Sequence, residues 1–462
     1  MAERERAATA TFADVSAFVR GLSFDRLPDE VVTSARRSLL DLIGVAAGGS
    51  RTRAAAIASA YAATQLCGSD RSARILFDGR RAGLAGAAFA GATTIDSLDG
   101  HDGHPLIKGH AGVAVLPALL ALVDGALPGE TASELDGREF LVCLVLGYEV
   151  ATRAGIALHA TVPDFHCSGA FNALGCAAIA ARLFGFDEPR TRHALGAAEY
   201  FGPRGQILRV CNSPTMVKDG SGWGAQVGMT AALLAKDGFT GAPALTVERG
   251  DASAFWRDLG MRWRIKEQYF KAYPVCRWAQ PAVEAALALQ RAHGFAVDEI
   301  ATISIESFRE AVALGSQCSM PRTTDEAQYS LPFPVAAALR FGAIGASEVD
   351  AFGLDDAGVA RLVAATEAIE DAEFSRRFPA ERWARVRIAL ADGRKLVSEP
   401  AQARGGAENP LSENELRQKY RALAEPVLGG ARAARIERSV GTLASDRDGL
   451  HDLLDELLKP VA

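Results

Sequence analysis

One short stretch, DSLDGHDGHPLIKGHAGVAVLP at residues 96–117, is dense in side chains that can move protons or hold charge. Those with acid, imidazole or amine groups include Asp99, His101, His104, Lys108 and His110. Glycines and Pro105 exclude a regular helix over residues 100–109, so we expect a loop that ends where an apolar helix begins. Aspartate and histidine at such a position can meet an anionic ligand and transfer protons.

Two other interpretations of this loop stay open. A solvated polar loop would have the same composition. The HDGH sequence brings His101 and His104 close together, which would suit a metal site. The i, i+4 helical spacing of HExxH is absent, however, and the chain has no CxxC pair. We therefore predict no metal here.

Two more stretches place polar groups near predicted helix starts. In FHCSGAFNALG, His166 and Cys167 precede Ser168, which can cap a helix of small residues. An imidazole there suits general acid–base catalysis, and a histidine bonded to backbone in a packed interior is the alternative. In PTMVKDGSGWG, Lys218 precedes a glycine-rich turn and can hold a carboxylate, with Arg204 upstream. The phosphate-loop pattern GxxxxGK[ST] is absent.

A fourth stretch, YFKAYPVCRWAQP at residues 269–281, lies at a predicted junction between domains. Lys271, Tyr273, Cys276 and Arg277 stand there beside aromatic side chains. Ligand clefts are common at such junctions, and a hinge with ordinary packing is the alternative.

The elements that must position these groups fall into two kinds. Helical patterns fill residues 1–265, as in LPDEVVTSARRSLLDLIGVAAGG, and return after residue 402. Between them, EIATISIESF alternates apolar and polar residues, and WARVRIALADGRKLVSEP predicts two strands around an Asp392-Gly393 turn. We predict a mainly α fold, with a discontinuous all-helical domain (residues 1–265 and 403–462) and an inserted, smaller α+β domain (residues 266–402).

Composition narrows the functional classes. The chain has 462 residues, 49% of them apolar, and a net charge of -6 with the charges interspersed, so we expect no nucleic-acid partner. We find no apolar run long enough for a membrane span and no signal-peptide pattern, and expect no membrane partner. The 7 scattered cysteines suit reduced thiols in a cytoplasmic protein better than a disulfide framework.

Taken together, the stretches resemble a known family. IDSLDGHDGHPLIKGHAGVAVLPALLAL, FHCSGAFNALGCAAIAARLFG, PTMVKDGSGWGAQVGMTAALLAKDGFTG and FKAYPVCRWAQP resemble the MmgE/PrpD family in order and spacing, and AQYSLPFPVAAAL is similar to a fifth segment. The resemblance covers nearly the whole chain. The family includes 2-methylcitrate dehydratase, cis-aconitate decarboxylase and iminodisuccinate epimerase. It implies a helical domain with an α+β lid, a homodimer, an active site between the domains, and no metal or organic cofactor.

The resemblance carries over by position to five predicted catalytic residues: Asp99, His110, His166, Lys218 and Lys271. We also predict that five residues contact the substrate: His101, His104, Lys108, Arg204 and Tyr273. The chain departs from the family pattern at two positions. Decarboxylase and dehydratase members carry a hydroxyl residue where this chain has Gly103, and a tyrosine where it has Phe333, although Tyr329 is nearby. The step from Asp99 to His110 is more similar to the epimerase.

The chemistry implied is proton transfer at a carbon next to a carboxylate. We predict that His166 or His110 is the base and the other the acid, that Asp99 orients an imidazole, and that the lysines hold a di- or tricarboxylate. The predicted function is dehydration of a 2-methylcitrate-like hydroxy acid. The alternatives are an epimerase of an iminodisuccinate-like substrate, a decarboxylase, a metal-dependent hydrolase and an inactive dimeric scaffold.

Overall fold

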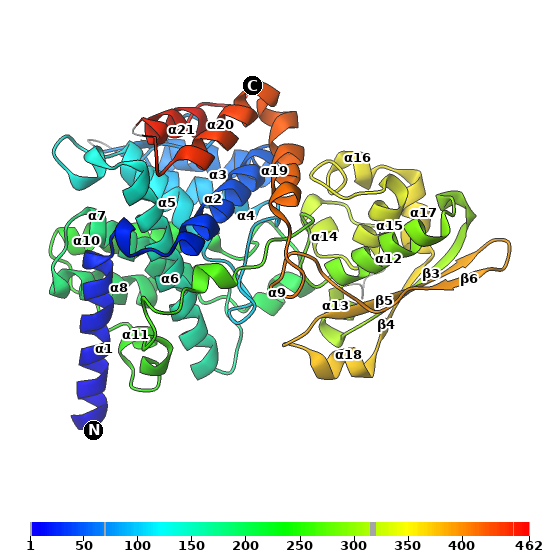
Figure 1. Ribbon diagram of the computed structural model, residues 1–462, viewed down its shortest axis with the longest axis horizontal. Helices are drawn as coiled ribbons and strands as arrows, with labels where there is room; N and C mark the ends of the chain where they lie inside the picture. Colours follow the sequence, from blue (N-terminus) through cyan, green and yellow to red (C-terminus); the bar gives the residue numbers. More distant parts are fainter. Residues whose placement is uncertain (1, 69–70, 315–319, 447, 462) are drawn as a thin grey trace.

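The computed structural model describes residues 2–68, 71–314, 320–446 and 448–461, and the side chains from residue 11 onward (Figure 1). Figure 1 shows the helices gathered on one side and a sheet with its own helices on the other. The mainly helical fold with a mixed α+β part confirms the predicted fold class. Cys318 lies outside the described residues, and the cysteines within them are free thiols.

Most helices come from the first half of the chain. They are α1 (Ala2–Gly21), α2 (Asp29–Gly49), α3 (Arg53–Gln65), α4 (Leu84–Asp96), α5 (Gly112–Asp124), α6 (Gly137–Thr161), α7 (Gly169–Leu183), α8 (Glu188–Phe201), α9 (Ile207–Asn212), α10 (Ser221–Lys236) and α11 (Leu245–Glu248). The short strands β1 (Ala73–Arg74) and β2 (Arg81–Ala82) form an antiparallel pair that the sequence did not predict. Helices α4, α5, α6, α7 and α10 pack on one another and form the core.

Helix α6 corrects one expectation. By length and composition it could cross a membrane, the one such helix among the described residues, whereas the sequence analysis found no apolar run of that length. Its most apolar window is wholly buried inside the protein, as in the core helix of a soluble protein. A fully buried ion pair, Arg153 Nε to Glu149 Oε2 at 3.3 Å, also lies within it.

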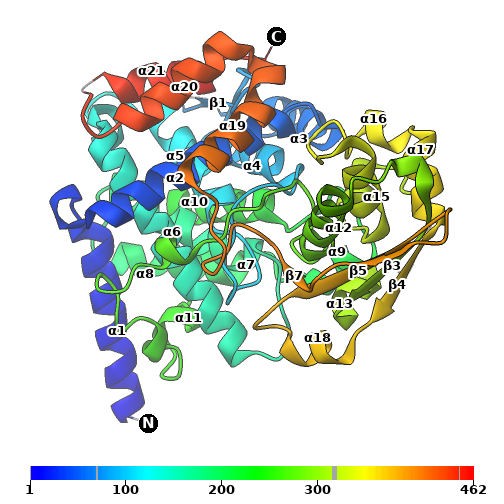
Figure 2. The same cartoon turned by 45° about the vertical axis from the view of Figure 1, so that its right-hand side comes forward.

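The C-terminal helices pack against a helix from the start of the chain. These are α19 (Glu413–Leu428), α20 (Gly430–Thr442) and α21 (Gly449–Leu457). Helix α19 packs along α2, and both views show the two side by side (Figure 2). Lys419 Nζ on α19 lies 2.5 Å from Asp41 Oδ1 on α2, and it donates to the carbonyl of Gly100 at 2.6 Å. The end of the chain therefore supports the acid–base loop.

The inserted region, which we call the lid, contains the strands and helices that lie between α11 and α19 in the sequence. They are α12 (Gln280–His293), β3 (Ile300–Ser307), α13 (Arg309–Leu314), α14 (Thr324–Gln328), α15 (Pro332–Phe341), α16 (Ala351–Leu354), α17 (Ala357–Ala364), β4 (Thr366–Glu370), α18 (Ala372–Arg377), β5 (Trp383–Leu390), β6 (Lys395–Val397) and β7 (Ala401–Gln402). The strand order is β4-β3-β5-β6, and β7 pairs with β5. The β3–β4 pair is parallel and the others are antiparallel.

The alternation in the sequence explains how the sheet packs. In β5 every second residue is buried (Ala384, Val386, Ile388 and Leu390), and α12 packs against this strand (Figure 2). Strand β3 pairs Ile303 with Ile388. The predicted turn joins β5 to β6, with Gly393 at φ 90°.

Candidate active site

The acid–base loop (residues 97–111) connects α4 to α5 and is mostly buried. Asp99 and Lys108 adopt positive φ angles of 53° and 47°. Gly103 pairs with Tyr269 through two backbone hydrogen bonds, from Gly103 N at 3.0 Å and from Tyr269 N at 2.7 Å. These bonds place the loop against the segment that carries Lys271.

A buried ion pair joins Lys271 to Asp99 of this loop. Lys271 Nζ donates to Asp99 Oδ1 at 2.6 Å and to the Asp99 carbonyl at 2.9 Å, and both side chains are at most 5% exposed. Burial opposes the charge on Lys271, but the Asp99 carboxylate outweighs it and raises the pKa of the lysine. The ammonium is therefore charged at neutral pH.

His110 is held as a neutral imidazole. Its Nδ1 lies 2.6 Å from the Asp102 carbonyl, and because a carbonyl oxygen only accepts, Nδ1 must donate. Its backbone N–H donates to Ser168 Oγ at 2.8 Å. Burial, together with the Lys271 charge, lowers the pKa of His110 to about 3. Nε2 therefore keeps a free lone pair, as a general base requires.

Asp219 is a candidate acid beside this base. Its Oδ2 lies 3.9 Å from His110 Nε2. Burial and the nearby Asp96 carboxylate raise the pKa of Asp219 well above its ordinary value, against opposing hydrogen bonds from Ser168. The raised pKa favours the protonated form of Asp219, in which the group can donate a proton.

These groups meet in a small cavity of about 50 Å³ between the helices and the lid. A cavity of this size has room for only a few water molecules. The residues that line it are Asp99, Lys108, His110, Ile207, Cys211, Asp219, Tyr269, Lys271, Cys276, Arg277, Trp278, Tyr329 and Arg382.

The structure thus brings together four predicted residues: Asp99, Lys108, His110 and Lys271. His101 lies next to His110, and the centroids of the two rings are 4.2 Å apart. Both nitrogens of His101 are buried without a hydrogen-bond partner, and burial lowers its pKa well below the ordinary value.

Lys218 is adjacent to the cavity but does not line it. Its ammonium pairs with Asp325 Oδ1 of the lid at 2.9 Å and also donates to Gln328. It lies 5.3 Å from the ring centroid of Tyr329, which does line the cavity. Lys218 thus joins the helices to the lid in this arrangement.

The other four predicted residues lie outside the cavity lining. His166 is half-buried and contacts the carbonyl of Arg204 through Nδ1 at 3.2 Å, while the Arg204 side chain is exposed. His104 Nε2 bonds Glu267 Oε2 at 3.0 Å, and Tyr273 donates to Glu284 Oε1 at 3.0 Å. His104 and Tyr273 thus bind other groups of the protein here, and their contact with the substrate stays a prediction.

Asp99, His101 and His110 could also hold a metal ion by geometry alone, because one ligand atom from each lies within 4.8 Å of the others. The Lys271 ammonium already binds the Asp99 carboxylate. A divalent ion at this point would face that positive charge at short range. The residues therefore fit an ammonium–carboxylate pair better than a metal.

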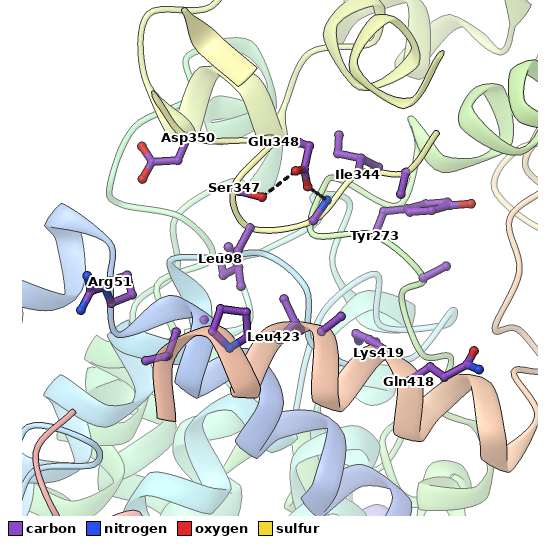
Figure 3. Close-up of a pocket in the computed structure, with 18 of the residues that line it drawn as sticks. Arg51, Leu98, Tyr273, Ile344, Ser347, Glu348, Asp350, Gln418, Lys419 and Leu423 are labelled. Carbon is purple, nitrogen blue, oxygen red and sulfur yellow. Dashed lines mark hydrogen bonds between the residues drawn. The ribbon is translucent and has the colours of Figure 1, made fainter. Parts of the chain in front are cut away.

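A larger cavity of about 570 Å³ lies between α19 and the segment 343–350 (Figure 3). Several of its polar groups are already paired. The Glu348 carboxylate accepts from Gly345 N at 2.7 Å and Ser347 Oγ at 2.6 Å, and Arg404 pairs with Glu415 at 2.6 Å. This cavity therefore offers little unpaired charge to an anion, and we place the chemistry in the smaller one.

Comparison with known proteins places the chain in a family. Residues 13–257 match the MmgE/PrpD N-terminal domain, and residues 273–444 match the MmgE/PrpD C-terminal domain. The chain belongs to the MmgE/PrpD family. This confirms the resemblance found in the sequence. The C-terminal match spans the lid and continues into α19 and α20.

Relatives of this MmgE/PrpD protein are distant but extend over most of its length. The cis-aconitate decarboxylase-like protein oryM of Aspergillus oryzae is 26% identical over 94% of this chain and 95% of its own. Human cis-aconitate decarboxylase is 25% identical over 89% of this chain and 87% of its own. Cis-aconitate decarboxylase of Aspergillus terreus is 23% identical over 97% of this chain and 96% of its own length.

Gly103, where some MmgE/PrpD members carry a hydroxyl residue, has no space for a side chain here. A Cβ at this position would lie 2.6 Å from Tyr269 Oη and 2.7 Å from His110 Nδ1. The phenol of Tyr269 fills this space instead, and Tyr269 is one of the residues that line the cavity. Tyr269 stands two residues before Lys271 in an extended segment, a spacing that places both side chains on one face.

Replacing Gly103 with serine should therefore lower stability by about 1–3 kcal/mol, the usual cost of overpacking, and lower activity by displacing His110. Urea unfolding and steady-state kinetics measure the two effects. Gly441→Ser is the matched control, because nothing lies within 4 Å of a Cβ there. Wild-type stability and turnover in Gly103→Ser would show that Tyr269 and His110 are not fixed as described.

Proposed function

We propose that this MmgE/PrpD protein is a cofactor-independent lyase that acts on a small polycarboxylate by removing a proton next to a carboxylate. One observation carries the proposal: the free Nε2 of neutral His110 shares a cavity with the buried Lys271–Asp99 pair and further cationic side chains. The ammonium suits the charge that develops on the substrate carboxylate, and the imidazole suits the proton that leaves.

The reaction that we favour is dehydration of a 2-methylcitrate-like hydroxy acid. Dehydration needs an acid for the departing hydroxyl as well as a base, and Asp219 Oδ2 is 3.9 Å from His110 Nε2. In this mechanism His110 takes the carbon-bound proton and Lys271 stabilises the resulting anion. Asp219 then protonates the hydroxyl, which leaves as water, and a carbon–carbon double bond forms. Proton exchange with solvent restores both groups.

Decarboxylation of a cis-aconitate-like acid is the second candidate, and the names of the relatives favour it. The same cation would then stabilise the anion left after carbon dioxide departs, and Asp219 would supply a proton to carbon. Epimerisation of an iminodisuccinate-like substrate needs proton transfer on two opposite faces, whereas His110 Nε2 and Asp219 Oδ2 lie only 3.9 Å apart.

The test is NMR in heavy water with metal-stripped full-length protein and 2-methylcitrate, citrate, cis-aconitate and iminodisuccinate. A new vinyl signal supports dehydration, release of bicarbonate supports decarboxylation, and deuterium incorporation with inversion supports epimerisation. Turnover that appears only with added metal would contradict the cofactor-independent mechanism, and no turnover on the whole panel would contradict this substrate class. The homodimer and the cytoplasmic location stay predictions, which light scattering and cell fractionation check.

A further inference from the structure

Tyr148 binds the part of the acid–base loop that holds His110. Its hydroxyl donates to Asp102 Oδ2 at 2.6 Å, and the carbonyl of the same aspartate accepts from His110 Nδ1 at 2.6 Å. Tyr148 and Asp102 are both 0% exposed. Burial and the neighbouring Asp102 carboxylate raise the pKa of Tyr148 well above its ordinary value, so the hydroxyl keeps its proton and acts as the donor. Asp102 thus connects the tyrosine to the imidazole.

Helix α6 gives Tyr148 a fixed position. Every residue of this helix from Phe140 to Leu158 is buried, and the helix packs against α7, α5 and α2. Gly112, at the start of α5, leaves room for the tyrosine, because a Cβ there would overlap the Tyr148 hydroxyl. The hydroxyl is therefore held by the helical core on more than one side.

The loop beside Asp102 contributes little stiffness of its own. Gly103 follows directly, and glycine leaves the backbone the widest choice of conformations. Gly103 bonds to the segment of Tyr269, which leads into the lid, whereas Tyr148 belongs to the helical core. The Tyr148 bond therefore keeps the Asp102 carbonyl in place relative to the helices that hold His110.

The position of this carbonyl decides which nitrogen of His110 carries the proton. A neutral imidazole is protonated on Nδ1 or on Nε2, and the hydrogen bond at one nitrogen selects the state of the other. With the carbonyl at Nδ1 the proton stays there, and Nε2 keeps its lone pair. If the carbonyl moved away, the tautomer protonated on Nε2 would become populated, and this form has no lone pair at Nε2 with which to accept a proton.

We infer that Tyr148 is a positioning residue of this site, because it holds His110, through Asp102, in the tautomer whose Nε2 is free. The inference rests on the proposed role of His110 as the base. It adds two residues to the site, and neither of them lines the cavity. Tyr148 therefore acts on the reaction without touching the substrate.

The test combines NMR of the histidine rings with kinetics on the full-length protein. In protein labelled with nitrogen-15 at histidine, loss of signals in His110→Gln identifies those of His110, and the wild type should show the Nδ1–H tautomer. Tyr148→Phe should show a mixture of both tautomers. Its kcat should fall by about 10- to 100-fold with little change in KM, because a slightly displaced base costs turnover and leaves binding intact.

Two variants at Asp102 check that Tyr148 acts through this residue. Asp102→Asn keeps an oxygen that accepts from the Tyr148 hydroxyl, and should keep the wild-type tautomer and most of the turnover. Asp102→Ala removes the acceptor and should lose as much turnover as Tyr148→Phe. The double variant should lose no more than either single variant, since both changes break one bond. Asp102→Ala also replaces Tyr148→Phe in the test if the latter fails to fold.

Tyr420→Phe is the matched control. This tyrosine is 1% exposed, and its hydroxyl donates to the Ala433 carbonyl at 2.8 Å, so the variant also loses one hydrogen bond of a buried phenol. It should lower the melting temperature, as Tyr148→Phe does, and leave the His110 tautomer and kcat unchanged.

The two measurements separate failure of the inference from failure of the proposed function. An unchanged His110 tautomer in Tyr148→Phe would overturn the inference, whatever the kcat of this variant. A mixed tautomer with wild-type kcat would instead contradict His110 as the base, and with it the proposed function. The tautomer is measured without substrate, so it decides the inference even if no compound on the NMR panel turns over.

Discussion

Replacing His110 with glutamine should lower the turnover number by about 10²- to 10⁴-fold, the usual contribution of a general base, with little change in melting temperature. The glutamine amide can still donate to the Asp102 carbonyl that now accepts from Nδ1 at 2.6 Å. It has no lone pair with the basicity of the imidazole Nε2. Steady-state kinetics on the substrate found by NMR, with calorimetry for the melting temperature, measure the two quantities.

The controls for this prediction use other histidines. His451 is an exposed residue of α21, and His451→Gln should leave the kinetics unchanged. His166→Gln tests whether the half-buried histidine outside the cavity also takes part, as the family resemblance predicts. Because burial lowers the pKa of His110 to about 3, the base is already deprotonated throughout pH 5–8, so its titration should not reduce the rate in that range. Normal turnover in His110→Gln would rule out its assignment as the base.

Replacing Lys271 with methionine should lower stability by about 3–5 kcal/mol, because it leaves the Asp99 carboxylate buried without its cation. Lys271→Met/Asp99→Asn removes both charges and should recover most of the lost stability. Neither variant should turn over substrate, since the cation that stabilises the developing negative charge is absent in both. Urea denaturation gives the free energies of unfolding, and the NMR assay gives the activity.

The two variants separate a role in folding from a role in catalysis. If Lys271 only supported the fold, the double variant would regain activity together with stability. A double variant as unstable as Lys271→Met would instead show that the unpaired Asp99 carboxylate is not the cause of the lost stability. Lys419→Met offers a comparison at another buried lysine–aspartate pair, whose ammonium lies 2.5 Å from Asp41 Oδ1.

Local sequence patterns predicted the strand whose buried and exposed residues alternate and the turn that requires a positive φ angle. The alternation in residues 299–308 predicted β3, observed at Ile300–Ser307, and the Asp392-Gly393 pair predicted the turn at which Gly393 has φ 90°. The contact between Asp99 and Lys271 spans 172 positions in the sequence. No local pattern encodes it, and only the family resemblance placed both residues in one site.

The rest of the site depends on how the lid docks, which short-range patterns do not report. Arg382 stands beside exposed Glu381 at the start of a strand, and so looked like an ordinary solvated arginine. Asp219 follows Lys218 directly, yet the two side chains have different surroundings: Lys218 pairs with the lid, whereas Asp219 faces His110. Residue type alone does not distinguish a buried carboxyl group from a solvated one.

The Lys419–Asp41 pair also has a consequence for the order in which a ribosome makes this chain. Asp41 emerges 378 residues before its partner, a delay of roughly 20 to 75 seconds at usual elongation rates. The same ammonium supports the Gly100 carbonyl in the acid–base loop. A nascent chain that has translated the lid but not α19 therefore lacks this support for the loop, so the site reaches the arrangement described above only when α19 has docked.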